Sequence, residues 1–91
     1  MFRYMKDFNP KENYHMRGFV NIFFNTQSTT KPTTIVTRIS KVENVSFAHL
    51  VTGQVDAIAF VEAQDSGSFR DALLEINLIS GVDHTSTFVV L

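Results

Sequence analysis

Cysteine and tryptophan are absent from this 91-residue chain, and glycine and proline are scarce, with four and two residues respectively. Without cysteine, neither a disulfide nor a thiolate metal site can supplement the core, which fits a reducing compartment. No apolar run reaches the ~18 residues of a membrane span, and the N-terminus lacks the apolar core of a signal peptide. These absences predict one small cytoplasmic domain without a membrane partner.

Clusters of basic residues are also lacking, although charged residues are present. The formal net charge is −1, from 8 Lys and Arg against 9 Asp and Glu. Residues 1–17 hold four of these cations and two of the acids, a balance of +2, so residues 18–91 hold four cations and seven acids, a balance of −3. Nucleic-acid binding needs clustered cations that displace counterions from phosphates. We therefore expect no direct contact between the folded part and nucleic acid.

The first part of the chain differs in pattern from the rest. Residues 1–17 are polar, contain Asn9-Pro10 and show neither helical nor strand periodicity, which predicts an N-terminal extension before a domain at 18–91. Aromatic residues beside its cations leave an RNA-contacting segment open as an alternative. A simple tail, or one that packs on a neighbouring subunit, is the favoured interpretation.

From Gly18 onward the chain alternates between strand-like and helix-like segments. Residues 19–24 are aromatic and β-branched, as in a strand. Residues 29–32 then predict a helix start, with a threonine cap and Pro32 in the first turn. Apolar residues follow at helical spacing, but so many neighbours are β-branched that a strand competes with the helix here.

The second half of the domain predicts a hairpin, a helix and a final strand. Extended runs at 45–52 and 55–63 are joined by the Gly53-Gln54 turn, and 65–68 caps a helix that Gly81 ends. Its inward stripe would be Phe69, Ala72, Leu73, Ile76 and Ile79. With a last strand at 85–91, the order is β-α-β-β-α-β. This is the ferredoxin-like α+β plan, a four-stranded antiparallel sheet with two helices on one face.

The predicted strands are apolar on both faces. In 55–63, for example, Val61 and the alanines lie on one face, whereas Ile58 and Phe60 lie on the other. Two helices can cover only one face of the sheet. The uncovered face therefore predicts a homodimer that forms through the sheets, as in a dimeric α+β barrel.

Asp56 is the most informative candidate for a binding site. It stands at the predicted start of a strand, just after a glycine turn, where a carboxylate is unusual unless it is exposed or partnered. A solvated hairpin whose carboxylate accepts from nearby backbone N–H groups is one interpretation. The other is a carboxylate and turn amides that meet the amino and carboxylate groups of a zwitterion.

The remaining polar residues predict neither a metal site nor catalysis. His49 and His84 fall on the second and fourth strands, which are opposite edges of this sheet plan, so they cannot share a metal within one subunit. The sequence has no serine elbow, no Gly-rich phosphate loop and no paired acid and base. We expect a protein that is not an enzyme and needs no cofactor.

Two motifs together resemble one family. They are the hairpin segment 48–56, with Thr52-Gly53-Gln54-Val55-Asp56, and the terminal segment Ile79-Ser80-Gly81-Val82 with 85–91. In this order, over residues 18–91, they look like the effector-binding (RAM) domain of the Lrp/AsnC transcriptional regulators.

The resemblance implies dimers that pair through their sheets and often assemble further into a ring of dimers. It also implies an amino acid or related effector bound between subunits, near the hairpin. The residues carried over by this match are Thr52, Gly53, Gln54, Asp56, Thr85, Thr87 and His49.

The match departs from the family in three ways. One is that the first helix, with Pro32 and many threonines, lacks the usual charged pattern. Full regulators place a helix-turn-helix domain before this module, and 17 residues cannot hold one, so we expect a stand-alone regulatory module. Val55 also stands where the family usually has an aromatic residue, which changes the shape of the pocket.

Two other functions remain open at this point. One is an interaction module without a ligand, which would co-assemble with a DNA-binding relative. The other is a small enzyme of the dimeric α+β-barrel type, for which the sequence supplies no chemistry.

Overall fold

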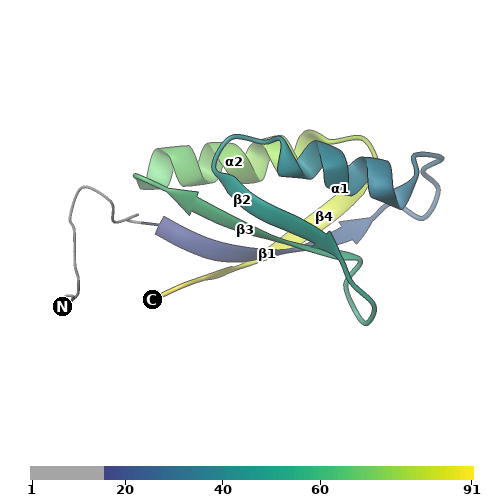
Figure 1. Cartoon of the computed structure of the whole chain (residues 1–91), viewed down its shortest axis with the longest axis horizontal. Coiled ribbons are helices and arrows are strands. Elements are labelled where there is room, and N and C mark those ends of the chain that lie inside the picture. Colours follow the sequence, from purple (N-terminus) through teal and green to yellow (C-terminus); the bar gives the residue numbers. More distant parts are fainter. Residues whose placement is uncertain (1–15) are drawn as a thin grey trace.

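The fold is that of a computed structural model, which describes residues 16–91 (Figure 1). The expectations about the N-terminal extension therefore lie outside the described residues, except that Met16 and Arg17 belong to the first strand. Within 16–91, no helix is long and apolar enough to cross a membrane.

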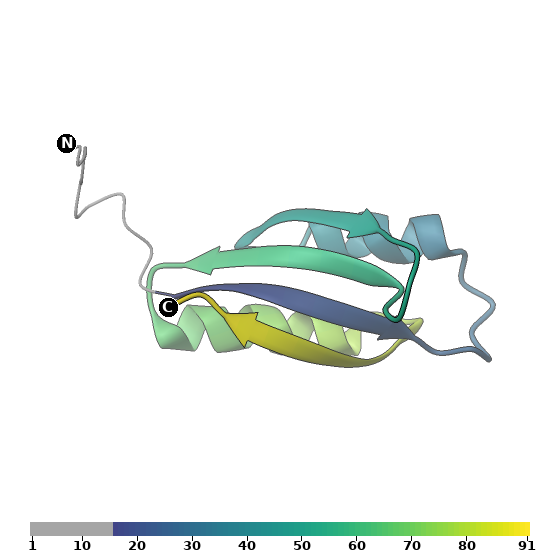
Figure 2. The same ribbon diagram turned by 90° about the horizontal axis from the view of Figure 1, so that it is seen from below.

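Six elements follow in the predicted order β-α-β-β-α-β. They are β1 (Met16–Phe24), α1 (Pro32–Ser40), β2 (Val45–Leu50), β3 (Ala57–Ala63), α2 (Ser66–Leu78) and β4 (Val82–Val89). The four strands form one antiparallel sheet in the order β2-β3-β1-β4, and both helices cover the same face (Figures 1 and 2). The ferredoxin-like fold class is confirmed.

The core lies between this sheet and the two helices. Alternate residues of the central strands β1 and β3 point into it and are fully buried, as a period of two requires. The largest of these fully buried core side chains, including those of the helices, are Ile22, Ile35, Ile39, Ile76, Val20 and Val61. Neither helix of residues 16–91 lies on the opposite face of the sheet (Figure 2).

Helix α1 forms in spite of its β-branched residues, but its start differs from the prediction. Lys31, not a threonine, occupies the N-cap position, and no side chain caps the helix. Pro32 is the first helical residue, as expected. Ile35 and Ile39 are buried against the sheet, so the packing of one apolar face decides the structure where local propensity does not.

Helix α2 follows its prediction closely. The Asp65 side chain accepts a hydrogen bond from the Ser68 backbone N–H at 2.7 Å, which caps the helix. Three residues of the predicted stripe are buried and the other two pack partly against the core. After the helix, Gly81 adopts a φ of +103° and lies against Ile35, so it turns the chain into β4 where no side chain fits.

The hairpin was predicted with a turn that is too tight. Strand β2 ends at Leu50 and β3 begins at Ala57, so residues 51–56 form a loop and Asp56 precedes the strand. The Val51 N–H donates to the Asp56 carbonyl at 3.2 Å and closes this loop. Strand β4 also begins earlier than predicted, at Val82, because it continues the pairing with β1 as far as Phe24.

Candidate functional site

The loop at 51–56 borders an open pocket of about 560 Å³. The pocket lies where three segments meet: the end of β1, the start of α1 and the end of β2 with its loop. Its lining residues are Phe24, Pro32, Leu50, Val51, Thr52 and Asp56. The structure therefore brings two of the predicted site residues, Thr52 and Asp56, to one pocket.

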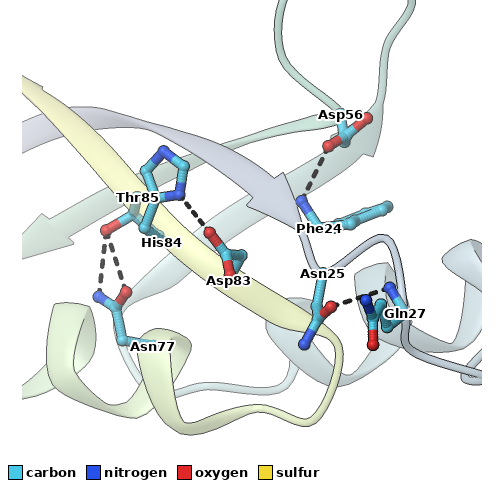
Figure 3. A network of polar contacts seen from close by, with 8 residues as sticks. All are labelled: Phe24, Asn25, Gln27, Asp56, Asn77, Asp83, His84 and Thr85. Atoms are coloured by element: carbon cyan, nitrogen blue, oxygen red, sulfur yellow. Dashed lines mark hydrogen bonds and ion pairs between the residues drawn. The ribbon is translucent and has the colours of Figure 1, made fainter.

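Asp56 is held in place by backbone contacts to β1. Its Oδ2 accepts a hydrogen bond from the Phe24 N–H at 2.8 Å, and its own N–H donates to the Ile22 carbonyl at 3.0 Å (Figure 3). The carboxylate is exposed, and within residues 16–91 its Oδ1 has no partner. One oxygen therefore fixes the end of β1, and the other is available to a ligand.

The turn residues beside Asp56 present backbone donors to solvent. Gly53 and Gln54 are exposed, and Gly53 adopts a φ of +135°, in the region that favours glycine. In the described part of the chain, neither of their N–H groups donates a hydrogen bond. They do not line the pocket itself, but they belong to the same loop as Thr52 and Asp56.

Thr85 and Thr87 do not line this pocket. Both are on β4, at the edge of the sheet opposite to β2. They pair with Ile22 and Val20, so they share the helix-covered face with those buried residues. The Thr85 hydroxyl meets the Asn77 amide of α2 at 3.1 Å (Figure 3).

The two histidines occupy the open face of the sheet. His49 on β2 stacks on Phe47 with 5.2 Å between ring centroids, and it does not line the pocket. His84 on β4 stacks on Phe23 at 4.3 Å and contacts the Asp83 carboxylate at 2.7 Å. They lie on opposite edges, as predicted, and residues 16–91 contain no group of side chains suited to a metal ion.

The chain also matches a known sequence family. The family model described as the Lrp/AsnC ligand binding domain matches residues 17–91. The chain belongs to this family.

Solved structures share the fold of this Lrp/AsnC ligand-binding domain at low sequence identity. Escherichia coli AsnC matches with a TM-score of 0.76 and 22% identity, over 93% of this chain and 57% of AsnC. The Thermus thermophilus protein TTHA0845 matches with 0.73 and 23%, over 84% of this chain and 92% of that one. The hypothetical protein PHS023 from Pyrococcus horikoshii matches with 0.71 and 19%, over 84% and 89%.

The lengths of these relatives differ. The chain spans little more than half of AsnC, but it spans most of the other two proteins. No curated protein sequence matches the chain significantly.

Sequence reasoning missed the apolar side of the pocket. Phe24, Pro32 and Leu50 were assigned only to the ends of elements, and no pattern marked them as site residues. The predicted topology held the necessary signal, because β1 ends where the antiparallel β3 begins. The loop that enters α1 and the loop that enters β3 must then meet at the same end of the sheet.

Proposed function

We propose that this Lrp/AsnC ligand-binding domain is an oligomeric regulatory module that binds an amino acid beside the 51–56 loop. The free Oδ1 of Asp56, at the rim of a pocket large enough for a small molecule, is the observation that carries the proposal. A carboxylate fixed by a backbone N–H needs no rearrangement to accept from an ammonium group, and such charge-assisted bonds are the stronger ones.

Each end of a zwitterion finds a counterpart in the loop. The ammonium group donates to Asp56, and the ligand carboxylate accepts from the N–H groups of Gly53 and Gln54. The Thr52 hydroxyl can bond either group. His49, Thr85 and Thr87 do not line the pocket, so we assign their contacts with the ligand to an adjacent subunit.

The open sheet face supplies the surface for that assembly. Four phenylalanines form a row across all four strands, since Phe47 pairs with Phe60, Phe60 with Phe19, and Phe19 with Phe88. Ring centroids lie 4.7 Å apart between Phe19 and Phe60 and 5.6 Å apart between Phe47 and Phe60. A contiguous exposed aromatic patch marks an interaction surface, and a second copy of this face is its proposed cover.

Ligand binding and assembly are then thermodynamically linked. A ligand that contacts two subunits binds only the assembled form and stabilises it by mass action. The module would thus report amino-acid concentration as a change in assembly, which a DNA-binding relative in the same assembly could transmit.

A thermal-shift panel of the twenty amino acids, with oligomer mass recorded by light scattering, tests this proposal. A ligand at about a hundred times its Kd contributes about 2.7 kcal/mol, a shift of several degrees for a domain of this size. A selective shift supports the proposal. A flat panel from a folded oligomer refutes ligand binding and favours an interaction module without a ligand.

The choice of variant at Asp56 matters for this experiment. Alanine would remove the ligand contact and also the bond to the Phe24 N–H, so the end of β1 would lose an anchor. Asparagine keeps one oxygen that accepts from the Phe24 N–H, and it replaces the other oxygen by an NH2 donor, so the charge and the acceptor for the ligand ammonium are both lost. Asp56→Asn is therefore the variant that tests ligand binding. Asp56→Ala measures how much the bond to the Phe24 N–H contributes to the stability of the fold.

A further inference from the structure

Most of the residues that line the open pocket beside Asp56 are apolar. Four of its six lining residues, namely Phe24, Pro32, Leu50 and Val51, have apolar side chains. They come from β1, α1, β2 and the loop, so no single sequence motif contains them. Leu50 is 43% exposed, although it is a large apolar residue at the end of a strand.

We infer that this pocket selects amino acids with a large apolar side chain, which lies against Phe24, Pro32 and Leu50 while Asp56 holds the ammonium group. This inference rests on the proposed function and specifies its ligand class. It follows from what the lining residues can and cannot pair with.

The lining residues offer no charged partner for a polar ligand side chain once Asp56 binds the ammonium group. Asp56 is the sole charged residue among the six lining residues, and the ligand ammonium occupies its free oxygen. A lysine, arginine, aspartate or glutamate side chain would find no polar partner among the four apolar lining residues, and any polar part that packs on them would lose water. The Thr52 hydroxyl is the one remaining side-chain polar group, and it lies on the loop side with Asp56.

The size of the pocket favours ligands with large side chains over glycine and alanine. A volume of about 560 Å³ falls within the range of small-molecule sites. A glycine or alanine ligand would leave the apolar lining residues exposed to water. A leucine or phenylalanine side chain would cover them and remove that surface from water. The gain from this burial grows with the apolar area covered.

Two matched ligand pairs test the inference. L-norleucine and L-lysine share a linear carbon chain and differ in the terminal ammonium group, and L-leucine and L-asparagine have side chains of similar length. Calorimetric titration of the full chain should give a Kd at least tenfold lower for norleucine than for lysine, and likewise for leucine than for asparagine.

A substitution at the apolar wall provides the second arm of the test. Leu50→Asp should raise the Kd for norleucine at least tenfold. The difference between the dissociation constants for lysine and norleucine should also become smaller. Leu74→Asp is the matched control, because Leu74 is 55% exposed on α2 and does not line the pocket. Circular dichroism verifies folding. If Leu50→Asp does not fold, Leu50→Ala serves instead and should raise the Kd severalfold.

The outcomes separate this inference from the proposed function. If lysine or asparagine binds as tightly as its apolar counterpart, and Asp56→Asn abolishes that binding, the inference is overturned and the proposed function stands. An unchanged norleucine Kd in a folded Leu50 variant also overturns the inference. If no amino acid binds, the inference and the proposed function fall together.

Discussion

Replacing Phe19 by lysine tests whether the open sheet face joins two subunits. Phe19 lies on central strand β1, in the middle of the phenylalanine row, and it is 42% exposed in the single chain. Lysine at this position can extend its ammonium group into water in a monomer, so the fold itself should survive. In a sheet-to-sheet dimer, the same group would be buried against the partner.

The magnitude follows from the exposed area. A phenylalanine side chain buries at most about 200 Å², so the 42% that remains exposed corresponds to roughly 80 Å². Two-fold symmetry doubles this to roughly 160 Å² per dimer, or about 4 kcal/mol at about 25 cal/mol per Å². Desolvation of two ammonium groups adds to this loss. We expect the dimer Kd to rise at least about a thousandfold.

Sedimentation equilibrium over a wide concentration range measures this change. Leu74→Lys is the control, because it places the same charge on an exposed leucine of α2 and should leave the sheet-mediated dimer intact. Two results would refute the reasoning: a wild-type chain that remains monomeric at about 100 µM, well above the Kd of a stable dimer, or a Phe19→Lys variant that is folded and dimerises with the wild-type Kd.

Three smaller predictions concern stability and are measured by thermal and urea unfolding. Gly81→Ala should destabilise by about 2–4 kcal/mol, because the residue has a φ of +103° and its Cβ would overlap the Ile35 side chain; an unchanged Tm would contradict this. Gly67→Ala, in the first turn of α2 with no atom closer than 3.4 Å to the new Cβ, should stabilise by about 0.5–1 kcal/mol, and a lower Tm would be the opposing result. Asn77→Ala removes the exposed side-chain bonds to the Thr85 hydroxyl and to the Leu73 carbonyl and should change the free energy of unfolding by less than about 1 kcal/mol.

The fold was predictable because each element carries its own signal. Strand β3 shows a strict alternation of buried and half-buried residues, and that alternation is visible in the sequence, where small residues alternate with Ile58 and Phe60. Helix α2 has both a cap and a stripe at the expected spacing. These are local properties, and the order of the elements then restricts the topology to very few arrangements.

Boundaries were predicted less well, because pairing partners set them. Val55 has a good residue type for a strand, yet β3 begins only at Ala57, where pairing with Leu50 starts. The threonines before α1 are good caps by type, but Lys31 takes the cap position. Such shifts depend on the neighbouring chain segments and leave no mark in the local sequence.

The candidate site was predictable only on its polar side. Thr52 and Asp56 belong to one loop and could be read together from the sequence. The apolar wall combines Phe24, Pro32 and Leu50, which are up to 26 positions apart in the chain, and the structure alone shows that they share a pocket. These three apolar residues, rather than the loop, are the basis for proposing amino acids with large apolar side chains as the ligands.

The most direct test of amino-acid binding at Asp56 is a calorimetric comparison of two proteins. The amino acid with the largest thermal shift is titrated into the wild-type chain and into Asp56→Asn, which keeps an acceptor for the Phe24 N–H. A hydrogen bond to a charged group contributes about 1.5–3 kcal/mol, so we predict a Kd at least about tenfold higher in the variant, at an unchanged Tm. Equal dissociation constants in the two proteins would contradict the assignment of Asp56 as the ammonium-binding residue.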